Sequence, residues 1–101
     1  MASLALRYAR ALLAAAVTAK SLEQVSEEVA FFQHLYQENE DFRLFLNAPE
    51  INRNQKIRVV QELFRERLSN TFSGFLLILL KHRRQDTFPE IASKFASLYN
   101  Q

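Results

Sequence analysis

The chain of 101 residues contains no cysteine, a single glycine and two prolines. Without cysteine, disulfide bonds and thiolate metal sites are excluded. One glycine cannot supply a glycine-rich phosphate loop, and so few turn residues leave little for the hairpins of an all-β fold. No apolar run approaches the roughly 20 residues that a membrane-spanning helix needs. These absences favour a helical domain that does not insert directly into a membrane.

Charge and hydropathy set further bounds on the class of protein. The 13 basic and 11 acidic residues leave a net charge of only +2, which is too balanced to indicate a nucleic-acid-binding protein. Arg7 and Arg10 interrupt the N-terminal apolar run, so no signal peptide is predicted. A hydrophobic content of 49% is enough for a packed core. We therefore predict a soluble, intracellular chain with one helical domain over residues 1–101.

Six segments repeat their apolar residues every three or four positions, which is the period of an amphipathic helix. They cover about residues 3–17, 21–36, 39–48, 52–64, 69–82 and 87–98. The joints between them are short, so consecutive helices must be antiparallel or steeply crossed neighbours. The predicted fold is all-α, a compact six-helix bundle.

Residues that typically cap helix N-termini mark most of the predicted starts. Asn39 and Ser69 precede the third and fifth segments. Capping boxes, in which a cap and a residue three positions later satisfy each other's backbone, are predicted at Ser21 with Gln24, Asn52 with Gln55 and Thr87 with Glu90. Pro89 then falls in the first turn of the last helix, where a missing N–H is harmless.

The helix predicted over 3–17 has more apolar surface than one core can use. A surface helix normally carries an apolar stripe of about 100°, yet the polar stripe here is only Ser3, Arg7 and Arg10. One broad apolar face consists of Ala5, Leu6, Ala9, Leu12, Leu13 and Ala16. A second, flanking face consists of Leu4, Tyr8, Ala11 and Ala15. Small residues let another helix approach closely, and tyrosine is favoured at interfaces.

The helix predicted over 69–82 has a similar surplus of apolar surface. Its core face consists of Phe72, Leu76, Leu79 and Leu80, its wet side of Ser73, Lys81 and Arg84, and its flank of Thr71, Phe75, Ile78 and His82. If the two helices lie side by side, their flanks form a shallow groove that fits an amphipathic helix. The pattern leaves a second interpretation open, in which the bundle itself buries these flanks.

Catalytic and metal-binding patterns are missing from the sequence. His34 and His82 are not spaced to share a metal with each other or with a carboxylate cluster. No Ser-His-Asp arrangement or nucleophile elbow can be argued. We expect five acidic residues to be solvated: Glu27, Glu28, Glu38, Glu40 and Asp41. The sequence predicts no enzyme activity, no cofactor and no metal site.

The run from Lys81 to Arg84 is the one strong basic cluster in the sequence. Cations at a helix C-terminus are favoured by the helix dipole, which is sufficient to explain the cluster. A rival interpretation is an RNA-binding helical bundle that uses Lys81, Arg83 and Arg84 with the arginines of residues 52–64. The cluster lacks the interleaved aromatic residues typical of such a surface.

Three stretches together resemble a known family. They are RYARAL at 7–12, NEDFRLFLNAPEINRNQKIRVVQELF at 39–64 and FLLILLKHRRQDTFPEIASKFASLYN at 75–100. They are similar, in order and separation, to the N-terminal domain of the delta subunit of F-type ATP synthases, called the oligomycin-sensitivity-conferring protein in mitochondria. Each motif is modestly specific, but together they cover nearly the whole chain.

The resemblance implies a non-catalytic stator component. In the family this bundle caps the catalytic head and binds the N-terminal helix of an alpha subunit between its first and fifth helices. The contact residues it implies here are Leu4, Tyr8, Ala11, Ala15, Phe75, Ile78, Leu79 and His82. It implies no cofactor, no nucleic acid and no membrane insertion. The expected location is the cytoplasmic face of a bacterial plasma membrane, as a peripheral subunit, or the equivalent organelle face.

Two departures from the family pattern affect these expectations. Many relatives have a glycine in the turn after the fifth helix, within N-G-R-L, where this chain has 82–85 as His-Arg-Arg-Gln. The geometry of that turn is therefore uncertain from sequence. The chain also stops at Gln101, near the end of the family's N-terminal bundle. We expect the region that engages the b subunits of the peripheral stalk to be missing from a fragment of this length.

Overall fold

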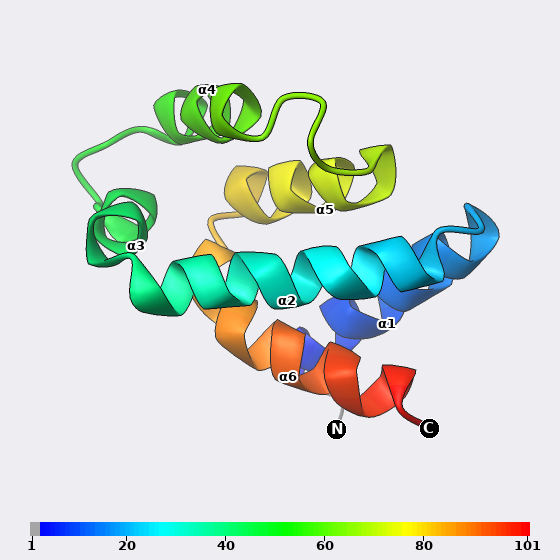
Figure 1. Cartoon of the computed structure of the whole chain (residues 1–101). Coiled ribbons are helices and arrows are strands. Elements are labelled where there is room, and N and C mark those ends of the chain that lie inside the picture. Colours follow the sequence, from blue (N-terminus) through cyan, green and yellow to red (C-terminus); the bar gives the residue numbers. More distant parts are fainter. Residues whose placement is uncertain (1–2) are drawn as a thin grey trace.

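The chain folds into six α-helices, which a computed structural model describes for residues 3–101 (Figure 1). The helices are α1 (Leu4–Thr18), α2 (Leu22–Glu38), α3 (Glu40–Asn47), α4 (Arg53–Leu63), α5 (Asn70–Lys81) and α6 (Phe88–Tyr99), with one 3-10 turn, η1 (Gln85–Thr87), before α6. No strand occurs within that range. The predicted all-α six-helix bundle is confirmed, and only the 3-10 turn was not anticipated.

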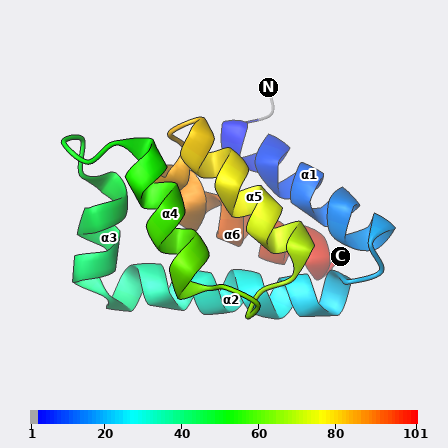
Figure 2. The ribbon, with the colours of Figure 1, turned by 90° about the horizontal axis from the view of Figure 1, so that it is seen from above.

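The helices pack around one core. Seen from above, α5 lies between α4 and α1, α2 runs along the lower edge of the view, and α6 lies beneath α5 and α1 (Figure 2). The radius of gyration is 12.9 Å, close to the value of about 13 Å for a compact domain of 100 residues. Within residues 3–101, no helix combines the length and the apolar character that crossing a bilayer requires.

Aromatic rings from four helices meet in the core. The ring of Phe32 on α2 lies 4.7 Å from that of Phe88 and 6.0 Å from that of Phe72, both edge-to-face. Aromatic pairs prefer this geometry over face-to-face stacking. Phe42 of α3 joins the cluster at 5.8 Å from Phe32. The cluster therefore ties α2, α3 and α5 to the start of α6.

The core faces predicted for the first and fifth helices are confirmed in their main part. Ala5, Ala9, Leu12 and Ala16 of α1 and Phe72, Leu76, Leu79 and Leu80 of α5 are all buried. Leu6 and Leu13, which were assigned to the same face of α1, are half-buried at its edge. Ile91 and Phe95 of α6 are buried as well and complete this region.

A side chain caps the start of a helix where the backbone of the capping residue is extended. The predicted box at Asn52 and Gln55 is present, and the side chains of Ser3, Asn39 and Ser69 each accept an N–H of their helix. The remaining two predicted boxes are wrong. Ser21 makes no capping bond at φ −127° and ψ 25°, and Thr87 continues a 3-10 turn with helical backbone angles. Extended backbone at the cap is what aims the oxygen at the helix, and neither residue has it.

The turn after α5 closes without glycine. Arg83 has φ 57°, in the left-handed region. Its N–H donates to Leu80 O at 3.1 Å, and the N–H of Arg84 donates to Leu79 O at 2.8 Å. This pair of bonds is the Schellman motif, which satisfies the last carbonyls of a helix. The chain thus keeps the usual left-handed turn with an arginine in place of glycine.

Candidate helix-docking surface

The first and fifth helices run antiparallel, and the start of α1 lies beside the end of α5 (Figure 2). Tyr8 connects them. Its ring lies edge-to-face with that of Phe75, at 6.2 Å between centroids, and its Oη lies 3.4 Å from Nδ1 of His82, whose tautomer decides which atom donates. We call the surface along this junction the α1–α5 strip, formed by Leu4, Tyr8, Ala11, Ala15, Thr71, Phe75, Ile78 and His82.

Several apolar side chains of the α1–α5 strip face solvent. Ile78 is 47% exposed, although it is a large aliphatic residue in the middle of a helix. Ala11 and Ala15 of α1 are exposed as well, and Leu4 and Tyr8 are half-buried. An isolated exposed aliphatic residue needs no explanation, but a contiguous apolar area can mark an interaction site. The bundle therefore leaves part of both flanks uncovered.

Two of the sequence-predicted contact residues lie below this surface. Phe75 is 7% exposed and supports Tyr8 from beneath, and Leu79 is 1% exposed and belongs to the core. Leu79 thus has no side-chain surface open to a partner in this structure. The open part of the strip consists of Leu4, Tyr8, Ala11, Ala15, Ile78 and His82.

Five hollows on the described part of the chain lie at other junctions of the bundle, and α1 lines none of these five. The shallow groove that the sequence predicts along the α1–α5 strip stays a prediction.

Positive charge borders the strip at one end. Arg7 on α1 and Lys81 on α5 are exposed at the end where His82 lies, and the sequences of α1 and α5 contain no acidic residue. A docked helix would therefore meet a positive potential at this end. Acidic side chains there would be complementary to it.

The basic run 81–84 lies at the end of α5, as expected of cations at a helix C-terminus. Arg53 reaches across from α4, where its Nη1 donates to Lys81 O at 2.6 Å. That bond satisfies one of the free carbonyls at the end of α5. The place of the cluster at the negative end of the α5 dipole is thus sufficient to explain it without a ligand.

Sequence reasoning missed one buried acid. Glu28 was expected to be solvated, but it is only 7% exposed. Its carboxylate accepts the backbone N–H of Ser69 at 2.5 Å and the Ser69 hydroxyl at 2.6 Å. Glu28 lies three residues after buried Val25 and four before buried Phe32, and this position beside the apolar face was the signal for burial. Glu27, Glu38, Glu40 and Asp41 are exposed as expected.

Lys56 is the second buried charged residue of the described chain, at 6% exposure. Its Nζ donates to Ala48 O at 2.7 Å, which fixes α4 to the end of α3. His34 is exposed on α2. No three His, Asp or Glu side chains within residues 3–101 are placed to hold a metal ion. These polar contacts are structural, so the α1–α5 strip remains the candidate functional surface.

Comparison with known proteins gives consistent matches. A family model described as the ATP synthase delta (OSCP) subunit matches residues 4–101. The ATP synthase subunit delta of Ruminiclostridium cellulolyticum is 32% identical over 95 residues, which is 94% of this chain and 53% of that protein. The subunit delta of Alkaliphilus metalliredigens is 35% identical over 92 residues, 91% of this chain and 51% of that protein. The chloroplastic subunit delta of Gracilaria tenuistipitata var. liui is 30% identical over 101 residues, 100% of this chain and 55% of that protein. The chain spans about half the length of these relatives.

Proposed function

Because the chain belongs to the ATP synthase delta (OSCP) subunit family, we propose that it is a non-catalytic stator component of an F-type ATP synthase. The relatives that support this role are named ATP synthase subunit delta. In this role the protein is a peripheral part of a membrane-associated complex and associates with other subunits of the synthase.

The proposed partner at the α1–α5 strip is the amphipathic N-terminal helix of an alpha subunit. The observation that carries this assignment is the 47% exposure of Ile78 on α5, together with the exposure of Ala11 and Ala15 on the neighbouring helix α1. An amphipathic helix recognises its target through apolar residues repeated every three or four positions, which a strip between two helices can accept. Ile78, Tyr8, Ala11 and Ala15 supply the apolar contact, and Leu4 and His82 extend it at one end.

The expected affinity follows from the area that the docked helix would cover. Burying about 500 Å² of apolar surface contributes about 12 kcal/mol before any opposing term. Ordering the peptide and restricting its motion offset much of this gain. A complex with a dissociation constant in the nanomolar range is consistent with these terms.

The function is mechanical. The rotor applies torque to the catalytic head, and a clamp between head and peripheral stalk must resist that rotation. A bundle with one aromatic core across four helices is stiff enough to transmit the load, because close-packed interiors deform little. The link to the b subunits would be made by the part of the relatives' length that this chain does not cover.

The test is calorimetric titration of the chain with a peptide of the alpha-subunit N-terminus from the same organism. Ile78→Asp places a charge in the apolar contact and is expected to weaken binding by at least about a hundredfold, since burying an unpaired charge is strongly unfavourable. The fold should persist, because Ile78 already faces water.

The matched control is Leu44→Asp, which makes the same chemical change at a residue 57% exposed on α3. It should bind the peptide as the wild-type chain does, and circular dichroism should show equal helicity for all three proteins. Equal affinity of Ile78→Asp and the wild-type chain would rule out the strip as the docking surface.

A further inference from the structure

The only glycine of the chain lies inside α5. Glycine destabilises a helix interior relative to alanine, because it loses more backbone freedom on folding. Such a residue is usually required by a positive φ angle or by a close neighbour. Gly74 has neither, since its φ is not positive and a Cβ built on it would meet no atom within 4 Å.

The position of Gly74 on α5 indicates that the reason for a glycine there lies in contact with a partner and not within the bundle. It lies four residues before Ile78 and three after Thr71, so it is a neighbour of the α1–α5 strip on the helix surface. Side chains on a helix lean toward its N-terminus, so Ile78 leans toward the turn that contains Gly74. At Gly74 the surface of α5 is therefore open down to the backbone, beside the exposed aliphatic residue of the strip.

We propose that Gly74 is the point at which the docked helix approaches α5 most closely, with a small residue of that helix facing it. This inference rests on the proposed function, because it assigns a contact to the same surface. Small residues at a helix crossing let the two backbones come nearer and increase the contact of the neighbouring side chains. Ala11 and Ala15 on α1 are also small and exposed, so the other side of the strip likewise lets a helix approach closely.

The charges around the strip indicate which charges the docked helix should carry. Arg7 and Lys81 lie at one end, and neither α1 nor α5 offers an acidic residue. The complementary partner is an amphipathic helix with acidic side chains toward that end. A second copy of this chain does not fit as well, because its own α1 and α5 would present like charges.

The experiment replaces Gly74 and measures stability and peptide binding separately. Gly74→Ala should raise the melting temperature by a few degrees, since the methyl group meets open space and the unfolded chain loses freedom. The same variant should bind the alpha-subunit peptide about tenfold more weakly, and Gly74→Leu about a hundredfold more weakly, because each added group holds the two helices apart.

Ala30→Leu is the control for added bulk, because Ala30 is exposed on α2, away from α1 and α5. It should bind like the wild-type chain. Wild-type affinity in Gly74→Leu, together with lost affinity in Ile78→Asp, would overturn the role of Gly74 and leave the docking surface intact. A lower melting temperature in Gly74→Ala would also overturn it, by showing that the bundle itself needs the glycine. Absence of binding by the wild-type chain would contradict the proposed function.

Discussion

Arg83 is held in a backbone conformation that does not suit its residue type. At φ 57° its Cβ crowds the following carbonyl, a conflict that glycine avoids. The Schellman bonds of Arg83 and Arg84 to the end of α5 compensate for it. Lys20 adopts φ 56° after α1 with the same two bonds, to Val17 O and, through Ser21, to Ala16 O. The chain thus ends two of its helices with strained lysine or arginine residues.

Arg83→Gly should therefore stabilise the fold. Relief of the left-handed strain exceeds the extra freedom that glycine gives the unfolded chain, so we expect the free energy of unfolding to rise by about 0.5–1 kcal/mol. Chemical denaturation measures this directly. Arg84→Gly removes the same exposed charge at φ −115° and should lower stability instead. Equal losses in the two variants would show that the turn is not strained.

Caps show where residue-level prediction from sequence stops. The sequence patterns at Ser21, Asn52 and Thr87 are equivalent, but only Asn52 itself has an extended backbone, with φ −74° and ψ 156°. At Ser21 the Schellman turn from α1 sets the backbone, and at Thr87 the turn η1 does so. The angle at a cap is thus determined by the preceding element, which a local motif does not include.

At the scale of elements, α2 and α5 are joined by a polar bond inside the bundle. Glu28 of α2 accepts both the N–H and the hydroxyl of Ser69, and the Ser69 hydroxyl in turn accepts the N–H of Phe72. A carboxylate at a helix N-terminus also interacts favourably with the helix dipole. The start of α5 is thereby fixed against the middle of α2.

Glu28→Ala should destabilise the bundle by about 2–3 kcal/mol, because two charge-assisted bonds are lost and a nearly buried N–H loses its acceptor. For a domain of this size the melting temperature should fall by roughly 10 °C or more. Glu27→Ala is the matched control at an exposed position and should change stability by less than about 0.5 kcal/mol. Equal melting temperatures for Glu28→Ala and Glu27→Ala would mean that the bond between Glu28 and Ser69 contributes little to stability.

The elements themselves were largely predictable. Apolar spacing located all six helices and the buried faces of α1 and α5, because a 3.6-residue period is a local property of the sequence. The bond between Glu28 and Ser69 was not predictable from the sequence, because its partners lie 41 residues apart. The strip was predicted as a flank, but the sequence did not separate exposed Ile78 from buried Phe75, which it assigned to the same flank. That difference depends on how α5 is rotated between α1 and α4.

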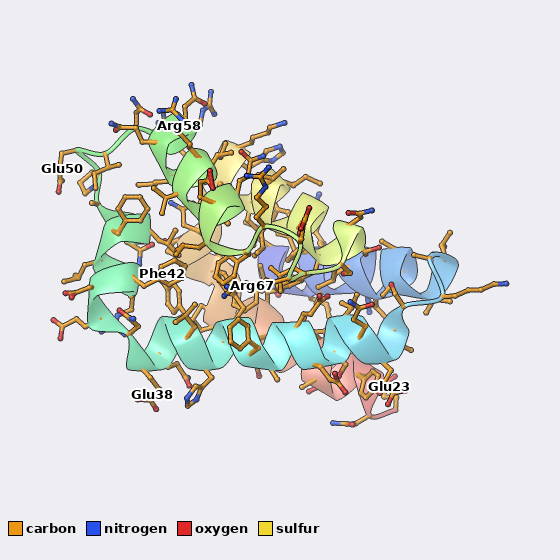
Figure 3. The ribbon with its side chains drawn as sticks, turned by 45° about the horizontal axis from the view of Figure 1, so that its top comes forward. Glu23, Glu38, Phe42, Glu50, Arg58 and Arg67 are labelled. Carbon is orange, nitrogen blue, oxygen red and sulfur yellow. The ribbon has the colours of Figure 1, made fainter. Side chains whose placement is uncertain are left out.

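At the scale of the whole molecule, the small net charge conceals a separation of charge. The residues from α2 to the end of α3 include six acidic residues (Glu23, Glu27, Glu28, Glu38, Glu40 and Asp41) and one basic residue, Arg43. Residues 53–84 include eight basic residues (Arg53, Lys56, Arg58, Arg65, Arg67, Lys81, Arg83 and Arg84) and two acidic residues, Glu62 and Glu66. Figure 3 shows Arg58 on the α4 side and Glu23 and Glu38 on the α2 side, at opposite edges of the view. The molecule therefore has an acidic and a basic side.

Salt dependence distinguishes the two partner classes that this distribution allows. Contact with about four phosphates would weaken RNA binding by roughly fiftyfold for a fourfold rise in salt. Apolar docking on the strip is not screened, and only the charges at its end respond, so the dissociation constant of the alpha-subunit peptide should change by less than about tenfold for the same fourfold rise, between about 50 and 200 mM salt. Titrations with the peptide and with a single-stranded RNA of about 20 nucleotides measure both. Tight, steeply salt-dependent RNA binding would favour the RNA-binding bundle.

The first helix of the chain packs most extensively against the last. The buried side of α1, with Ala9 and Leu12, is covered by α6 and its residues Ile91 and Phe95. During synthesis on the ribosome, α1 emerges before α6 and must wait for the residues between them before this side leaves water. Long-range closure of this kind slows folding and leaves apolar surface open to other nascent chains in the meantime. The order in which the helices are translated thus leaves the apolar side of α1 accessible to a chaperone until α6 has been made.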